Sequence, residues 1–237
     1  MKLTVLGKYG PYPPSGGATS GYLIKSKTQN VLIDCGSGTL SRLTGQIDLK
    51  DLSFIIFSHL HFDHVSDFGV LSYALSFSGR KGKVNVYLPN FESAVYTALS
   101  KIDKFNLINV CEGKVYSEGD LTFSFYKMTH PVLSYGVKIT DGNSTFSYTG
   151  DTTFNDDLPF LISGSDLAVC DGAFLETDFD DKKPHMSIKQ ASSLAKYSKK
   201  VLVSHISSRY SDEIVTREIL SVTDKAEVAI EGKTYEF

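Results

Sequence analysis

The feature that most constrains this chain is a ten-residue stretch, residues 58–67 (SHLHFDHVSD), in which three histidines and two aspartates follow an apolar run. The apolar run, residues 52–57, is long enough for a buried strand and too short for a helix. In open α/β folds, ligands bind in loops beyond the carboxyl ends of strands. The stretch therefore predicts a ligand-binding loop at the end of a buried strand.

The side chains of this loop are those of a metal site. His59 and His61 are two residues apart, so their imidazoles point the same way in an extended segment, and Asp63 and His64 follow in the same turn. Imidazole nitrogens and carboxylate oxygens bind zinc and, with more oxygen ligands, manganese or iron. A single histidine would be read as an ordinary polar loop residue. Three histidines within six positions, with an aspartate among them, favour a metal site.

Length and charge limit the kind of protein that surrounds this site. A chain of 237 residues can bury a sizeable core, and we expect one domain over residues 1–237 because no repeat, low-complexity tract or linker divides it. The net charge of −3 gives no electrostatic reason to expect a general nucleic-acid binder. The N-terminal apolar run is too short for a signal peptide, and no stretch approaches the ~20 apolar residues of a membrane span, so no membrane partner is expected.

Cysteine usage indicates a reducing compartment. The three cysteines, Cys35, Cys111 and Cys170, are odd in number, widely spaced and without a CxxC pair. We expect reduced, mostly buried thiols and a cytoplasmic location.

The chain alternates strands, loops and helices in its first half and has more strand character in its second half, which predicts an α/β fold. The expected strands are residues 3–6, 21–25, 30–34, 52–57, 84–88, 121–126, 135–140, 145–148, 166–170 and 200–203, and the expected helices are 39–43, 67–77, 90–102 and 187–197. Asp67 is expected to cap the helix 67–77.

Three loops carry further expectations. Residues 7–20 form a long loop rich in Gly, Pro and Ser, and loops of that length are usually functional. The glycines of residues 34–38 (DCGSG) permit a close approach to the metal loop or an anion-binding helix start, and a plain strand-to-helix turn is the alternative. Residues 79–83 (GRKGK) predict a solvated basic turn, with a phosphate contact as the alternative.

The positions of the histidines point to a single site. Each of the six lies beyond a strand end or before a helix, and none falls in an apolar periodic stretch, where a packing role would place it. They are His59, His61, His64, His130, His185 and His205. We infer that essentially all of them serve one site.

Several motifs in order along the chain resemble the metallo-β-lactamase superfamily: residues 58–64 (SHLHFDH), then His130, then residues 148–152 (YTGDT), then His205. Residues 33–36 (IDCG), 184–187 (PHMS) and 202–210 (LVSHISSRY) look most like the ribonuclease Z branch of phosphodiesterases. The resemblance implies a four-layer αββα sandwich, with metal ions at one edge between the two sheets.

The resemblance also implies a site for two divalent metal ions, with zinc as the expected ion and manganese or iron as alternatives. His59, His61 and His130 would hold the first ion, Asp63, His64 and His205 the second, and Asp151 would bridge them. A hydroxide shared by the two ions would be the nucleophile, which Asp63 would orient or deprotonate. His185 would donate a proton or hydrogen bond to the leaving group.

Four further residues are candidates for supporting roles. Asp34 and Asp171 follow strands and are candidates to hold histidine N–H groups, with a turn or capping role as the alternative. The branch has a glutamate where this chain has Asp171, which is one methylene shorter. Arg209 and Tyr210 either build the pocket or anchor the last helix.

The spacing of two ligands bears on the substrate. Only the twenty residues 131–150 separate His130 from Asp151, and the expected hairpin uses them, so the tRNA-gripping arm of ribonuclease Z has no room. We therefore expect a phosphodiesterase acting on small phosphodiesters, such as cyclic nucleotides, nucleotide-like esters or short oligonucleotides, rather than on long nucleic acid. The alternatives are a tRNA 3′-processing-type endoribonuclease, a lactonase or β-lactamase-like ester or amide hydrolase, and a metal-holding or interaction protein that is not an enzyme. The resemblance also implies a homodimer, because members of the family are commonly dimers.

Overall fold

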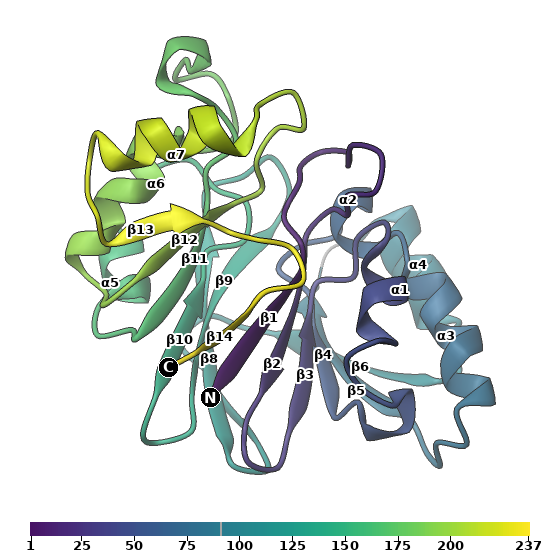
Figure 1. Cartoon of the computed structure of the whole chain (residues 1–237). Coiled ribbons are helices and arrows are strands. Elements are labelled where there is room, and N and C mark those ends of the chain that lie inside the picture. Colours follow the sequence, from purple (N-terminus) through teal and green to yellow (C-terminus); the bar gives the residue numbers. More distant parts are fainter. Residues whose placement is uncertain (91) are drawn as a thin grey trace.

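Two seven-stranded mixed sheets form the centre of the molecule, and helices cover the outer face of each sheet (Figure 1). The computed structural model describes residues 1–90 and 92–237. The first sheet has the strand order β14-β1-β2-β3-β4-β5-β6, and the second has the order β13-β12-β11-β10-β9-β8-β7. The predicted four-layer αββα sandwich is confirmed.

The strands are β1 Lys2–Gly7, β2 Gly21–Lys25, β3 Asn30–Ile33, β4 Phe54–Ile56, β5 Val84–Pro89, β6 Phe105–Val110, β7 Val115–Glu118, β8 Leu121–Met128, β9 Ser134–Thr140, β10 Thr145–Tyr148, β11 Leu167–Asp171, β12 Val201–Ser204, β13 Ala226–Val228 and β14 Thr234–Glu236. The α-helices are α1 Thr39–Leu43, α2 Phe62–Val65, α3 Phe68–Phe77, α4 Ala94–Ser100, α5 Leu158–Ile162, α6 Ile188–Ser193 and α7 Asp212–Leu220, and the short 3₁₀ helices are η1 Leu49–Asp51, η2 Glu176–Asp178 and η3 Leu194–Lys196.

Three apolar clusters hold the four layers together. The cluster between the sheets contains Phe54 of β4, whose ring stacks on Phe123 of β8 with centroids 5.2 Å apart. The second cluster packs α1, α3 and α4 on the first sheet, and the third packs α5, α6 and α7 on the second sheet. The alternation predicted over residues 121–126 is present, since Leu121, Phe123 and Phe125 are buried between the sheets.

Strand direction decides where the polar loops meet. Strands β3 and β4 are parallel, as are β10, β11 and β12. Their carboxyl ends therefore lie at one edge of the sandwich, and the loops beyond them carry Asp34, His59, Asp151 and His205.

The prediction that Asp67 caps its own helix is wrong. Its side chain makes no capping hydrogen bond to α3. Instead, Asp67 Oδ2 accepts a hydrogen bond of 2.9 Å from the backbone N–H of Leu40, in the first turn of α1. The packing of α1 against the start of α3 thus assigns this carboxylate to the neighbouring helix.

Two other predicted helices are shorter than expected. In place of residues 90–102, α4 begins after Ser93, whose hydroxyl accepts from the backbone N–H of Tyr96, and position 91 of the prediction lies outside the described residues. In place of residues 187–197, α6 begins with a capping box formed by Ser187 and Gln190 and passes into η3. Side-chain capping sets the N-terminal ends of both helices, whereas α6 ends because the chain continues as the 3₁₀ helix η3.

Several elements had no predicted range, namely α2, α5, α7, η1, η2, β6, β7, β13 and β14. Most are short, and β14 exists through its antiparallel pairing with β1. As expected, the cysteines are free thiols, with Cys35 and Cys170 buried and Cys111 exposed. Among the described residues, no helix has the length and apolar character needed to cross a bilayer.

Candidate metal centre

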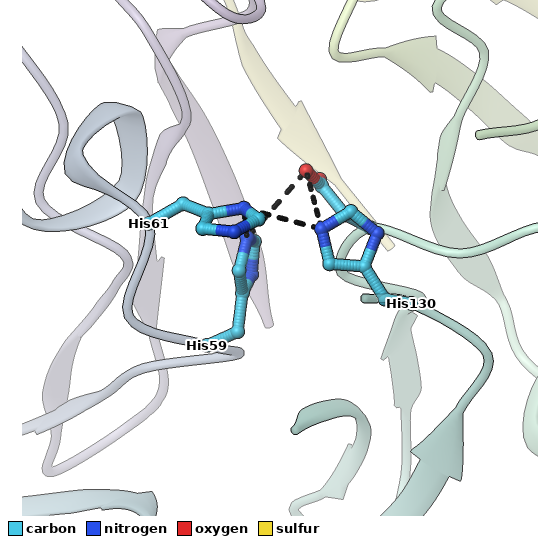
Figure 2. Close-up of side chains that lie close together, drawn as sticks. His59, His61 and His130 are labelled. Atoms are coloured by element: carbon cyan, nitrogen blue, oxygen red, sulfur yellow. Dashed lines mark hydrogen bonds and ion pairs between the residues drawn. The ribbon is translucent and has the colours of Figure 1, made fainter. Parts of the chain in front are cut away.

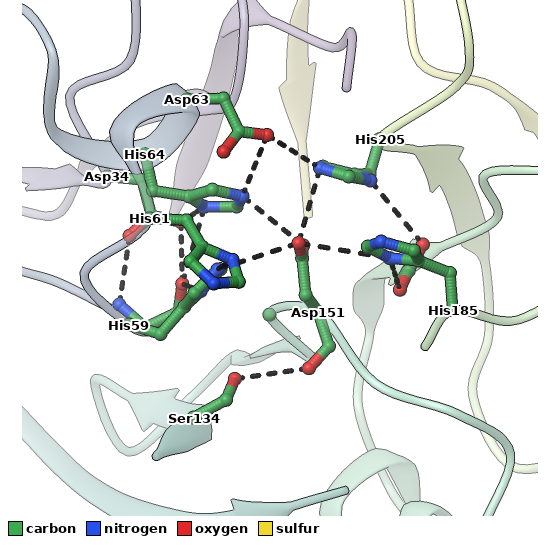
Figure 3. A network of polar contacts seen from close by, with 12 residues as sticks. Asp34, His59, His61, Asp63, His64, Ser134, Asp151, His185 and His205 are labelled. Carbon is green, nitrogen blue, oxygen red and sulfur yellow. Dashed lines mark hydrogen bonds and ion pairs between the residues drawn. The ribbon is translucent and has the colours of Figure 1, made fainter. Parts of the chain in front are cut away.

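All six histidines gather at the edge where the parallel strands end, together with Asp63, Asp151 and Asp171. Figure 3 shows Asp151 at the centre of this cluster, with His59 and His64 on one side and His185 and His205 on the other. The structure thus brings together every residue that the sequence proposed as a metal ligand. That these residues bind metal stays a prediction.

The first group contains His59, His61, His130 and Asp151, and its three imidazoles converge (Figure 2). His61 Nδ1 lies 3.0 Å from His59 Nε2 and 3.2 Å from His130 Nε2. Zn–N bonds of about 2.0–2.1 Å in a tetrahedron separate ligand atoms by roughly 3.3 Å. The spacing of these nitrogens therefore fits one zinc-sized cation.

The surroundings of these imidazoles leave ring nitrogens available to a cation. His130 Nδ1 lies 3.1 Å from the carbonyl oxygen of Pro184, which only accepts, so Nδ1 carries the hydrogen and Nε2 faces the cluster with its lone pair. Burial is the main cause that lowers the pKa of His59, His61 and His130 below the usual histidine value. The three rings are therefore neutral at neutral pH, which is the form that binds metal.

The second group contains Asp63, His64, Asp151 and His205. His205 Nε2 lies 3.1 Å from Asp63 Oδ2 and 3.3 Å from Asp151 Oδ2. His64 Nε2 lies 3.3 Å from Asp151 Oδ1, yet both atoms are buried without a hydrogen-bond partner among the described residues. Buried polar atoms are rarely left unpaired, so a cation between them fits this donor set.

Asp151 is shared by both groups and is fully buried. Burial opposes its charge, but the histidines around it, His205 and His64 first, outweigh burial and hold the pKa of Asp151 well below the usual range. Burial likewise opposes a charged His64, but Asp151 and Asp34 outweigh it and raise the pKa of His64 well above its usual value. The cluster therefore has one shared carboxylate that attracts positive charge from both sides.

Asp34 orients the second group from behind. Its carboxylate accepts from His64 Nδ1 at 2.7 Å, and from the backbone N–H and hydroxyl of Ser58 at 2.9 and 2.8 Å. The predicted contact of Asp34 with a histidine is therefore present. The hydroxyl of Tyr148 also donates to Asp34 at 2.8 Å, a contact that the sequence did not reveal. In the sequence, the only indication of this contact is that a tyrosine directly precedes the loop that carries Asp151.

Asp171 orients the far side of the cluster. Its Oδ2 atom lies 2.9 Å from His185 Nδ1 and accepts from the backbone N–H of Thr152 at 3.0 Å. The aspartate thus reaches a histidine although it is shorter than the glutamate of the related branch. Asp171, His185, Asp151 and His205 also form a third group of ligand-type atoms, which overlaps the second. Because Asp171 already contacts His185 and Thr152 through hydrogen bonds, we interpret it as a carboxylate that orients His185 rather than as a metal ligand.

His185 lies beside the cluster, in the loop that precedes α6. Its Nδ1 is 3.8 Å from Asp151 Oδ2, and its ring stacks on that of His205 with centroids 4.8 Å apart. Burial opposes its charge, but the neighbouring Asp171 outweighs burial and raises the pKa of His185 to about 9. The imidazole is therefore protonated at neutral pH and able to donate a proton.

Gly36 permits the predicted close approach of residues 34–38 to the metal loop. A Cβ on Gly36 would lie 2.0 Å from the backbone oxygen of Asp63 and 2.2 Å from the hydroxyl of Thr19. The backbone N–H of Cys35 donates to the carbonyl of His64 at 2.7 Å. This segment therefore packs its backbone directly against the metal loop.

Arg209 and Tyr210 make their contacts away from the histidines. The hydroxyl of Tyr210 donates to Asp178 Oδ2 at 2.5 Å, and Arg209 Nη2 donates to that hydroxyl at 3.2 Å. Both residues therefore tie the segment after β12 to η2. Tyr210 also packs against the apolar cluster that contains α6 and α7, in agreement with the predicted anchoring role, and the pocket role stays a prediction.

Comparison with known proteins agrees with this geometry. A family model described as the metallo-beta-lactamase superfamily matches residues 14–204. The Bacillus subtilis protein YhfI, described as a probable metallo-hydrolase, is 33% identical over 205 residues, which cover 83% of this chain and 82% of YhfI. Ribonuclease Z of Methanosarcina acetivorans is 24% identical, with 90% of each chain covered.

Two solved structures extend the comparison. The crystal structure of YhfI matches with a TM-score of 0.92 and 29% identity, over 99% of both chains. The short form of human tRNase Z matches with a TM-score of 0.81 and 17% identity, over 100% of this chain and 99% of the other, which shows a shared fold.

Proposed function

Because the chain belongs to the metallo-β-lactamase superfamily and is a metallo-hydrolase of that family, we propose that it is a phosphodiesterase that hydrolyses small phosphodiesters. The observation that carries this proposal is the position of His185, 3.8 Å from the shared Asp151 and held by Asp171. A phosphodiester expels an alkoxide, which needs a proton as it leaves. A protonated imidazole beside the centre meets that need.

The donor set supports two divalent ions, with zinc as the first choice and manganese or iron as alternatives. His59, His61 and His130 would hold one ion, Asp63, His64 and His205 the other, and Asp151 would contact both. Bound there, the ions would supply positive charge to the phosphoryl oxygens and activate a water molecule as the nucleophile.

Two residues of the chain, Asp63 and His185, would transfer the protons of the reaction. Burial opposes the charge of Asp63, but its hydrogen bond with His205 and nearby positive charge outweigh burial and lower its pKa. Asp63 is therefore a carboxylate able to orient an attacking water and accept its proton. His185 would give its proton to the leaving oxygen, and because Asp171 holds Nδ1 of that ring, Nε2 would be the donating nitrogen.

The hairpin between His130 and Asp151 supports a small substrate. Residues 131–150 contain β9, β10 and, between them, a short turn in which Asp141 Oδ1 accepts from the backbone N–H groups of Asn143 and Ser144. These residues form a compact hairpin without an inserted arm. A long RNA substrate would need another surface.

The direct test is a substrate panel on metal-reconstituted protein. With zinc or manganese supplied, we expect hydrolysis of bis(p-nitrophenyl) phosphate and of cyclic nucleotides or dinucleotides, and we expect a chelator to abolish it. The variant His59→Ala is the control for contaminating enzymes. Absence of turnover on all of these diesters would overturn the proposal.

The same panel tests the second candidate, an endoribonuclease of the tRNA 3′-processing type, which the similarity to ribonuclease Z favours. Faster cleavage of a precursor tRNA than of small diesters would replace our proposal with this one. Faster hydrolysis of lactones or β-lactams would instead assign an ester or amide hydrolase. The free thiols fit a reducing compartment, and we propose the cytoplasm as the site of action.

A further inference from the structure

A partly exposed lysine, Lys183, lies two residues before His185 at the rim of the metal centre. Among the ion pairs that the described residues form, none includes Lys183. Its Nζ atom donates one hydrogen bond, to the backbone oxygen of Asp178. An ammonium group has three donors, so Lys183 keeps two donors and a positive charge for another group.

The chain that follows Lys183 is fixed to the metal centre. The next residue is Pro184, whose carbonyl oxygen lies 3.1 Å from His130 Nδ1. His185 comes next, with its Nδ1 atom 2.9 Å from Asp171 Oδ2. Lys183 is therefore placed by the same contacts that orient a proposed metal ligand and the proposed acid.

The ammonium of Lys183 lies over an aromatic ring that borders His185. Its Nζ atom is 4.3 Å from the centre of the Phe174 ring, whose face attracts a cation. The Phe174 ring lies in turn 6.0 Å from the ring of His185, measured between centroids. The two distances together place the ammonium within about 10 Å of the His185 ring. We call Phe174 and Lys183 the leaving-side wall, because His185 would protonate the leaving oxygen.

The ring of Phe174 is not part of the protein core. It is partly exposed, and within the described part of the chain it belongs to none of the three apolar clusters, although its neighbour Leu175 packs against the third. The carbonyl of Phe174 accepts from the backbone N–H of Ile188 at 2.8 Å, which fixes its backbone beside α6. The leaving-side wall therefore combines a fixed aromatic surface with a positive charge.

We propose that the leaving-side wall binds a second anionic group of the substrate, carried by the alcohol that the reaction releases. The inference rests on the proposed phosphodiesterase function and names its substrate class, a phosphodiester whose leaving group bears a phosphate or another anion. Water attacks phosphorus, the bond between phosphorus and the leaving oxygen breaks, and that oxygen takes the proton of His185. Lys183 holds the anionic group of the same alcohol throughout.

The charges around the wall favour a short substrate. Residues 176–181 (ETDFDD) carry four exposed carboxylates directly before Lys183 in the chain, and only Asp178 among them lies near a cation, 3.7 Å from Arg209. Carboxylates repel further phosphates. One terminal anion can therefore meet Lys183, whereas a continuing nucleic-acid chain would meet this acidic segment.

The basic turn at residues 79–83 is a weaker candidate for binding an anion. Arg80 Nη1 donates to backbone oxygens in the segment 50–52, and Lys83 pairs with Asp103 at 2.6 Å. These charges are engaged by the protein itself, in agreement with the interpretation as a solvated turn rather than as a phosphate contact.

Three dinucleotides of adenosine test the proposal on the metal-reconstituted full chain. ApA has no terminal phosphate, pApA carries one on the nucleoside whose 3′ oxygen would leave, and ApAp carries one on the nucleoside whose 5′ oxygen would leave. Chromatography of the products identifies the oxygen that leaves, and hence the probe with its phosphate on the leaving alcohol. We expect the KM of that probe to be at least ~10-fold lower than the KM of ApA, because it gains a charge-assisted contact.

Lys183→Met should remove this preference and leave the KM of ApA unchanged, because methionine keeps an unbranched side chain without its charge. Lys182→Met is the matched control, since Lys182 is the exposed neighbouring lysine and its backbone N–H, which the substitution keeps, donates to Asp180. Calorimetric titration of the three dinucleotides into metal-loaded His185→Ala, with and without Lys183→Met, measures the same preference as binding, without turnover.

The outcomes separate the inference from the proposed function. If the wild type hydrolyses none of the three dinucleotides, the proposed function fails and the inference fails with it. If the wild type hydrolyses ApA, but the phosphate brings no preference or the preference persists in Lys183→Met, only the inference is overturned. An equal loss of affinity for ApA and for the phosphate-bearing probe in Lys183→Met would also overturn it, because that result indicates a purely structural lysine. Zinc content and circular dichroism report whether the variants are folded.

Discussion

Gly10 lies directly against the imidazole of His205. A Cβ on Gly10 would lie 2.1 Å from both Cε1 and Nε2 of that ring. The backbone N–H of Gly10 donates to the carbonyl of Ile206 at 3.2 Å, and the N–H of Ile206 donates to the carbonyl of Lys8 at 2.9 Å. His205 itself has a positive φ of 56°. The long loop of residues 7–20, expected to be functional, thus packs a glycine onto a proposed ligand.

Gly10→Ala should therefore displace His205 and weaken the binding of one metal ion while sparing the other. We expect the affinity for that ion to fall by about 10- to 100-fold, as it does when groups that orient metal ligands are changed. Calorimetric zinc titration measures the two sites. Gly69→Ala is the matched control, because a Cβ at Gly69 meets nothing within 4 Å. Two sites of wild-type affinity in Gly10→Ala would contradict this role.

Asp151→Ala should abolish binding at both positions, because this carboxylate belongs to both groups of ligand-type atoms. Metal content by mass spectrometry measures the loss. Zinc should also raise the Tm of the wild type by roughly 5–10 °C, since a ligand at 100 times its Kd stabilises by about 2.7 kcal/mol, and should leave Asp151→Ala unchanged. Asp156→Ala, an exposed aspartate five residues on, should behave like wild type. If Asp151→Ala retained one full equivalent of zinc per chain, Asp151 would not be a ligand shared by both positions.

His185→Ala should keep its metal and lose turnover. Removal of a general acid lowers kcat by about 10²- to 10⁴-fold, and KM should change less because the metal positions are intact. The effect should be smallest on substrates whose leaving group needs no proton, such as p-nitrophenyl esters. A variant that loses metal together with activity would identify His185 as a ligand.

Asp34→Ala should destabilise the fold by at least ~3 kcal/mol. The substitution leaves three buried side-chain donors, on His64, Ser58 and Tyr148, without their acceptor, and each such group costs about 1–3 kcal/mol. Urea unfolding measures the change. Asp120→Ala is the control, because Asp120 accepts three hydrogen bonds, two of them from side chains, but lies at the surface, and its loss should cost under ~1 kcal/mol. If the two variants lost equal unfolding free energy, burial of the Asp34 hydrogen bonds would not explain the effect.

Much of the proposed centre is visible in the order of the amino acids, because its signals are local. The apolar run before residues 58–67 marks a strand end, and the spacing of His59, His61, Asp63 and His64 makes one short loop rich in ligand-type side chains. The alternation of residues 121–126 sets which side chains face the core. Each of these inferences depends on neighbours within a few positions.

Only the tertiary structure shows which residues these side chains contact. Asp67 could be recognised as a cap but not as the cap of α1, and Asp34 could be recognised as an orienting acid but not as the acceptor for Tyr148, 114 residues away. The contact of Gly10 with His205 and the position of Lys183 over Phe174 are equally invisible in the sequence. These relationships depend on sheet order, register and helix packing, which join segments far apart in the chain and leave no periodic signal within any one of them.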